Sequence, residues 1–175
     1  EQIKSRLAGG LVIDIQPPDL NLRKKILKSK IQEIEKNFAD FLGVKYAVAV
    51  TNGTSALFLA ARVAGIKTGD HVLVSTTTNI ATALAVYHNG GITIPVDSDN
   101  ITWNLNLDLI EKLITKKTKA IIPVHFLGLP VDMDKLGYIA KKKKLIVIED
   151  CAESQGATWK NKLTGTFGDM ACYSF

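Results

Sequence analysis

A turn in the first third of the chain carries residues that could bind a phosphate group. Asn52, Gly53, Thr54 and Ser55 follow the apolar run Tyr46–Thr51 and precede a helical pattern. Gly53 would allow the backbone to come close to a ligand. The first N–H groups of the helix would then face the phosphate together with the hydroxyls of Thr54 and Ser55. Serine and threonine are also common helix N-caps, so capping alone explains the segment equally well.

Asp150 could support a second kind of chemistry, the stabilisation of negative charge on a heterocyclic ring. It ends the apolar run Leu145–Asp150. A carboxylate there can accept a hydrogen bond from a protonated ring nitrogen and keep that nitrogen protonated, which makes the ring an electron sink. The alternative is an aspartate that caps the turn after a strand. His125 ends another apolar run, and the sequence does not separate a ligand role from a structural role for it.

The elements that would position these residues alternate between strands and helices. Apolar, β-branched runs predict strands at Tyr46–Thr51, His71–Ser75, Gly91–Val96, Lys119–His125 and Leu145–Asp150, with a weaker one at Ala171–Phe175. Helical spacing predicts helices at Leu22–Leu42, with Gly43 as its C-cap, and at Ser55–Ala64, Ile80–His88, Leu107–Thr115 and Met133–Lys142. Apolar strands that alternate with helices are typical of a three-layer α-β-α fold with a mostly parallel sheet.

Ligands bind at the carboxyl ends of the strands in such a sheet. We expect that edge to bring together Asn52–Ser55, Thr76–Asn79, His125 and Asp150.

The N-terminal residues do not follow the alternation. Pro17 and Pro18 interrupt the chain there. We therefore expect an irregular segment over residues 1–21 and one domain over residues 22–175.

Composition and charge restrict the class of protein. The chain has 175 residues and 46% hydrophobic content, which is ordinary for one globular domain, and no apolar run reaches the length of a membrane-spanning helix. Much of the net charge of +5 comes from Lys141–Lys144, at the end of a predicted helix, where cations favour the helix dipole. We therefore predict neither a nucleic-acid nor a membrane partner. Cys151 and Cys172 are expected to be buried free thiols, which fits a cytoplasmic location, and no metal site is predicted.

Several motifs in a fixed order, within residues Ile31–Phe175, resemble a known family. They are Asn52–Leu57, Lys119–His125 with Gly128, Ile148–Glu153, and Gly165–Asp169 followed by Ser174 and Phe175. At this spacing they resemble the DegT/DnrJ/EryC1/StrS family of sugar aminotransferases, which are fold-type-I pyridoxal-phosphate enzymes. The resemblance implies that residues 22–175 are part of the large domain of a PLP-dependent transferase related to aspartate aminotransferase.

The resemblance also implies where the phosphate of pyridoxal 5'-phosphate would bind. Gly53, Thr54 and Ser55 match the family's phosphate cradle, and Ser174 matches a further phosphate contact.

Other positions match residues around the cofactor ring. Asp150 would bind the pyridine nitrogen and is the expected catalytic residue, while Glu153 would lie near the ring. Asn79 occupies the position that usually stacks an aromatic side chain on the ring, so stacking would be weaker or supplied by another residue.

Three parts of the family pattern are expected to lie outside this chain. The Schiff-base lysine should follow Ser174 and Phe175 within a few residues, and no lysine present matches it. A seventh strand, which the family places between the sixth and the first, and the C-terminal small domain would also follow Phe175. We therefore expect an incomplete large domain that is inactive by itself.

The function implied is the transfer of an amino group from an amino acid, usually glutamate, to a keto group of a nucleotide-linked sugar. The product would be an amino sugar for a polysaccharide or a glycosylated metabolite, and the active site would form between the subunits of a homodimer. One alternative is a short, non-catalytic relative that binds the cofactor or a nucleotide sugar. A Rossmann-type nucleotide binder is a further alternative, which the absence of Gly-x-Gly-x-x-Gly after the first strand disfavours.

Overall fold

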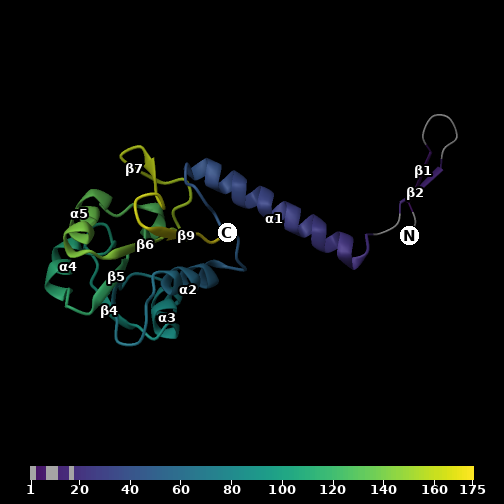
Figure 1. Ribbon diagram of the computed structural model, residues 1–175. Coiled ribbons are helices and arrows are strands. Elements are labelled where there is room, and N and C mark those ends of the chain that lie inside the picture. Colours follow the sequence, from purple (N-terminus) through teal and green to yellow (C-terminus); the bar gives the residue numbers. More distant parts are fainter. Residues whose placement is uncertain (1–2, 7–11, 16–17) are drawn as a thin grey trace. The chain divides into compact units, whose positions relative to one another are not determined.

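The computed structural model describes residues 3–6, 12–15 and 18–175 (Figure 1). The chain divides into two compact units. One contains the residues up to Phe41 together with Lys45–Ala49, and the other contains Leu42–Val44 together with Val50–Phe175.

The N-terminal unit consists of a strand pair and a long helix. β1 (Ile3–Arg6) pairs antiparallel with β2 (Val12–Ile15), so the region expected to be irregular contains two strands. α1 (Leu20–Leu42) begins two residues before the predicted start, where the Asp19 carboxylate accepts a hydrogen bond from the N–H of Leu22 (2.7 Å). Gly43 follows with a φ of +68°, as expected of a C-cap glycine.

The second unit is built on a five-stranded parallel sheet with the order β4-β3-β5-β6-β9. Its strands are β3 (His71–Ser75), β4 (Ile92–Val96), β5 (Thr118–Ile122), β6 (Ile146–Asp150) and β9 (Met170–Cys172). Its helices are α2 (Gly53–Val63), α3 (Ile80–His88), α4 (Leu107–Leu113) and α5 (Met133–Lys143), with a short 3-10 turn η1 (Phe126–Gly128). A small hairpin, β7 (Thr158–Trp159) and β8 (Lys162–Leu163), lies between β6 and β9 in sequence.

The sheet is covered on both faces, as the continuous apolar runs predict (Figure 1). On β6, Ile148 packs in one core with α2 and α3, whereas Val147 packs in the other core with α4 and α5. Full burial of a side chain such as Ile148 contributes about 1.5–3 kcal/mol to the free energy of unfolding. The predicted three-layer α-β-α fold with a parallel sheet is confirmed.

One predicted strand is wrong. Residues Tyr46–Val50 form no strand, although their apolar, β-branched pattern favours one. A strand needs a neighbour for its N–H and C=O groups, and no described strand pairs with this segment. Edge strand β9 pairs only with β6 within the described sheet. The resemblance places a further strand between β9 and the segment Tyr46–Thr51, and that strand is not among residues 18–175.

The predicted strand Lys119–His125 is shorter in the structure. β5 ends at Ile122 because Pro123 has no N–H to donate to the ladder. The carbonyl of Pro123 still accepts from the N–H of Asp150 (2.9 Å), which keeps the loop after β5 beside the end of β6.

None of the helices in the described part of the chain has the combination of length and apolar character that crossing a bilayer requires.

Candidate functional site

The predicted phosphate cradle lies at the start of α2. Asn52 is the N-cap, and its side-chain oxygen accepts a hydrogen bond from the N–H of Ser55 (2.8 Å). The hydroxyl of Ser55 lies 3.0 Å from that of Thr51, and Thr54 is exposed. The capping role therefore belongs to Asn52, and the hydroxyls of Thr54 and Ser55 are not used as caps.

The structure brings Gly53 and Ser174 together, although they are far apart in sequence. A Cβ atom on Gly53 would lie 2.8 Å from the Cβ and 3.1 Å from the hydroxyl of Ser174. Any side chain at position 53 would thus displace Ser174. Glycine at position 53 thus allows the Ser174 hydroxyl to lie beside the N-terminus of α2.

Asp150 ends β6 and is almost fully buried. Its Oδ2 accepts a hydrogen bond from the hydroxyl of Thr82 on α3 (2.8 Å), and its Oδ1 accepts from the N–H of Ala152 (3.2 Å). Burial raises the pKa of this carboxyl above its usual value, an effect that the two hydrogen bonds oppose. The Oδ1 atom caps the turn after β6, as the turn-capping interpretation of Asp150 predicts, and the Oδ2 atom is bound by Thr82 of α3.

The remaining predicted ring contacts have structural roles in the described chain. Asn79 is the N-cap of α3, where its side chain accepts from the N–H of Ala81 (3.0 Å). Glu153 is exposed, and its carboxylate accepts from the N–H of Leu127 (2.8 Å), whose φ of +49° is unusual for leucine. Asn79 is three residues before Thr82, so the start of α3 lies at the same sheet edge as Asp150.

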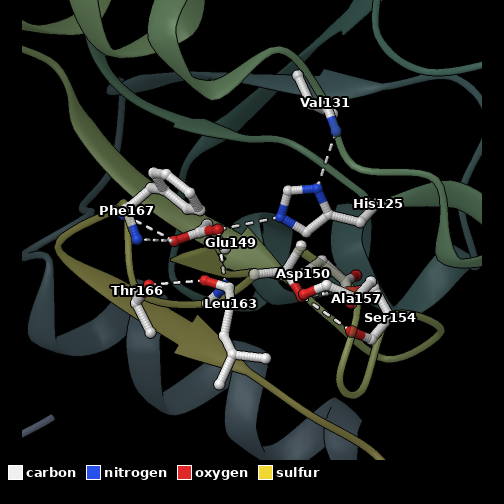
Figure 2. A network of polar contacts seen from close by, with 12 residues as sticks. His125, Val131, Glu149, Asp150, Ser154, Ala157, Leu163, Thr166 and Phe167 are labelled. Carbon is white, nitrogen blue, oxygen red and sulfur yellow. Dashed lines mark hydrogen bonds and ion pairs between the residues drawn. The ribbon is translucent and has the colours of Figure 1, made fainter. Parts of the chain in front are cut away.

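His125 is a structural residue. Its Nδ1 accepts from the backbone N–H of Val131 (3.1 Å), and its Nε2 lies 3.0 Å from a carboxylate oxygen of Glu149 (Figure 2). A backbone N–H can only donate, so Nδ1 carries the lone pair and Nε2 carries the hydrogen. Both ring nitrogens are used inside the fold, and the side chain is fully buried.

Glu149 is the buried residue that the sequence analysis missed. One carboxylate oxygen accepts from the N–H groups of Phe167 (2.8 Å) and Gly168 (2.6 Å), and the other accepts from the N–H of Gly165 (2.8 Å) and from His125 (Figure 2). Burial alone would raise its pKa, but the hydrogen bonds outweigh burial and hold the pKa below its usual value. The available signal was a glutamate inside an apolar strand followed by a glycine-rich turn.

His125, Glu149 and Cys151 place potential metal-binding atoms within 4.8 Å of one another. The histidine nitrogens and the glutamate oxygens are already hydrogen-bonded. Burial also raises the pKa of the Cys151 thiol far above neutrality, and a protonated thiol is a poor metal ligand. This group is a polar core network.

The fold and the arrangement of the site define a partial α/β domain of the fold-type-I aminotransferase class. The chain belongs to the DegT/DnrJ/EryC1/StrS aminotransferase family, whose model matches residues 20–175.

Curated relatives and solved structures agree with this assignment. The chain is 48% identical over 145 residues to GDP-perosamine synthase of Caulobacter vibrioides, covering 83% of this chain and 39% of the relative. It is 43% identical over 150 residues to dTDP-3-amino-3,6-dideoxy-alpha-D-galactopyranose transaminase of Aneurinibacillus thermoaerophilus, covering 86% and 41%. An aminotransferase structure from Psychrobacter cryohalolentis matches with a TM-score of 0.82 and 37% identity, covering 87% of this chain and 41% of that one. The chain thus spans about two fifths of the length of these relatives.

Proposed function

We propose that this chain is the cofactor-binding part of a pyridoxal-phosphate-dependent aminotransferase. The full-length protein would transfer an amino group from an amino acid, glutamate, to a keto group of a nucleotide-linked sugar. Family membership supports the reaction class. The names of the relatives, a GDP-perosamine synthase and a dTDP-amino sugar transaminase, support the substrate class.

The close approach of Gly53 to Ser174 at the start of α2 is the observation that carries the proposal. A helix N-terminus offers free N–H groups and a partial positive charge, both of which suit a phosphate. In this proposal Gly53, Thr54, Ser55 and Ser174 bind the phosphate group of the cofactor. Glycine at position 53 supports this proposal because it lets the Ser174 side chain lie against the start of α2, where a Cβ atom would displace it.

Asp150 fits the opposite end of the same cofactor. It is a buried carboxylate at the carboxyl end of the sheet, and none of the ion pairs found among residues 18–175 involves it. A protonated pyridine nitrogen would supply the missing positive charge. Asp150 would hold the proton on that nitrogen, and Asn79 and Glu153 would lie along the ring. When bound, pyridoxal phosphate supplies an electron-withdrawing ring that stabilises negative charge on the reacting carbon.

We further propose that the covalent anchor, a lysine, belongs to the remaining length of the full protein. We also propose a homodimer with the active site between the subunits and a cytoplasmic location; the resemblance to sugar aminotransferases supports both proposals. The expected product is an amino sugar for polysaccharide or metabolite glycosylation.

The test uses the full-length protein with glutamate and a GDP- or dTDP-linked keto sugar. We expect pyridoxal phosphate to bind, its absorbance to change on addition of glutamate, and an amino sugar nucleotide to form. Asp150→Asn should lower kcat by about 10²–10³-fold because it cannot hold the ring nitrogen protonated. The exposed Asp134→Asn is the matched control and should leave kcat unchanged. Cofactor binding without transamination would favour the non-catalytic relative, and absence of cofactor binding would refute the proposal.

A further inference from the structure

A chain of two hydroxyls leads to Asp150 at the start of α3; the Thr82 side chain is buried and the Thr78 side chain is partly buried. The Thr82 hydroxyl lies 2.8 Å from Oδ2 of Asp150 and 2.7 Å from the hydroxyl of Thr78. Thr82 is fully buried in the first turn of α3, and the two partners Thr82 and Asp150 are 68 residues apart in sequence. The contact therefore depends on the packing of α3 against β6.

The direction of these hydrogen bonds follows from the chemistry of the groups. An ionised carboxylate only accepts hydrogen bonds, so the Thr82 hydroxyl donates its single hydrogen to Asp150. Thr82 must then accept from Thr78, and the chain runs from Thr78 through Thr82 to Asp150. Hydrogen bonds that end on a charged group are shorter and stronger than those between neutral groups.

Few other groups support the negative charge on Asp150. Burial disfavours the charge, and the carboxylate of Glu153 repels it. His125 favours the charge electrostatically, but it gives Asp150 no hydrogen bond, because its Nε2 is directed to Glu149 and its Nδ1 accepts from Val131. The thiols of Cys151 and Cys172 stay protonated, because burial raises the pKa of both, that of Cys172 to about 12. The Thr82 hydroxyl and the N–H of Ala152 are thus the donors that favour the ionised form.

We propose that Thr82 is a positioning residue that fixes the orientation of the Asp150 carboxylate and keeps it ionised for the ring nitrogen of the cofactor. The inference about the cofactor rests on the proposed function. The effect on Asp150 itself concerns only contacts within this chain. A merely structural role for Thr82, joining α3 to β6, would predict lower stability but an unchanged carboxylate.

The experiment compares three variants of the full-length protein. Thr82→Val keeps the shape of the side chain and removes the hydroxyl, while Thr82→Ser keeps the hydroxyl. Thr93→Val is the matched control, because the Thr93 hydroxyl bonds the carbonyl of Ala83 on the same helix (3.4 Å) and makes no contact with Asp150. The measurements are the pKa of Asp150 by carboxyl-carbon NMR without cofactor, the Kd of pyridoxal phosphate, and the pH profile of kcat.

We expect Thr82→Val to raise the pKa of Asp150, to weaken cofactor binding by about tenfold, and to shift the acidic limb of the kcat profile upward in pH. Thr82→Ser and Thr93→Val should both keep the wild-type values of the pKa, the Kd and the pH profile. If Thr82→Val lowers only the thermal stability, the positioning role is wrong. If the wild-type protein does not bind pyridoxal phosphate, the proposed function fails, and the pKa of Asp150 still tests the Thr82 contact.

Discussion

At the scale of single residues, adjacent acids on β6 have different environments. Glu149 accepts hydrogen bonds on both oxygens from the turn that contains Gly165, Phe167 and Gly168, and its pKa is held low. Asp150 has fewer donors, and burial raises its pKa. The better-satisfied acid, Glu149, stabilises the fold, and the less-satisfied acid, Asp150, is the one that the proposed function assigns to the cofactor.

Gly53→Ala tests the close approach at the start of α2. The added Cβ would lie 2.8 Å from that of Ser174, so we expect a loss of about 1–3 kcal/mol in the free energy of unfolding and weaker binding of pyridoxal phosphate. Urea denaturation and cofactor titration measure the two effects. Gly137→Ala is the control: position 137 lies in α5 with open space around it, and alanine there should stabilise by about 0.5–1 kcal/mol. Equal behaviour of both variants would contradict the crowding at Gly53.

Glu149→Gln tests the turn that precedes β9. Glutamine places an NH₂ group against backbone donors, so we expect a loss of about 3 kcal/mol in the free energy of unfolding. Denaturant unfolding measures this loss, and hydrogen exchange at Gly165 and Gly168 should become faster. Glu111→Gln removes an exposed ion pair with Lys142 and should change stability by less than about 1 kcal/mol. A similar small change for both would show that the Glu149 contacts contribute little.

The lowered pKa of the Glu149 carboxyl predicts that the stability of the fold depends on pH. The pKa of Glu149 in the folded protein lies below 4.5, its ordinary value, so ionised Glu149 stabilises the fold above pH 4.5. This contribution is lost as the pH falls below 4.5 through the folded-state pKa. We expect the free energy of unfolding to fall more steeply in the wild type than in Glu149→Gln over that acidic range, measured by urea titrations at stepped pH. Asp150 acts with the opposite sign in both proteins, so parallel curves would rule out the role of Glu149.

At the scale of elements, local patterns determine the helices better than the strands. The helix predicted at Ile80–His88 has the observed bounds, since apolar spacing is a local signal. The strand predicted at Tyr46–Thr51 does not form, because a strand also needs a neighbour and no described strand pairs with this segment. The hydroxyl contact between Thr82 and Asp150 was likewise beyond sequence reasoning, as it joins residues on different elements.

The end of α5 offers a test at this scale. Lys144 is the C-cap and has a left-handed backbone, with a φ of +55°, which costs energy for any residue with a Cβ atom. Lys144→Gly should therefore stabilise the protein by about 0.5–1 kcal/mol in chemical denaturation. Lys143→Gly, one position earlier and inside the helix, should destabilise it by about 1 kcal/mol. Destabilisation by both substitutions would mean that the left-handed cap does not limit stability.

At the scale of the whole molecule, the three-layer architecture could be predicted from the sequence. Continuous apolar runs at β3, β5 and β6 require cover on both faces, and two separate cores provide it. The predicted site residues Gly53 and Ser174 do meet, because α2 and β9 are adjacent. Their roles toward a cofactor, like those of Thr54, Ser55, Asn79, Asp150 and Glu153, stay predictions.

The alternation of side chains on β6 has a genetic consequence. Val147 and Ile148 face different cores, and Glu149 and Asp150 continue this alternation toward the turn and toward α3. Inserting or deleting a single codon in β6 would turn the Glu149 and Asp150 side chains to the opposite faces of the sheet, away from their present hydrogen-bond partners. The reading frame would be kept, but the contacts of both acids would be lost together. The contacts of Glu149 and Asp150 therefore depend on the length of this strand as well as on the identity of the two residues.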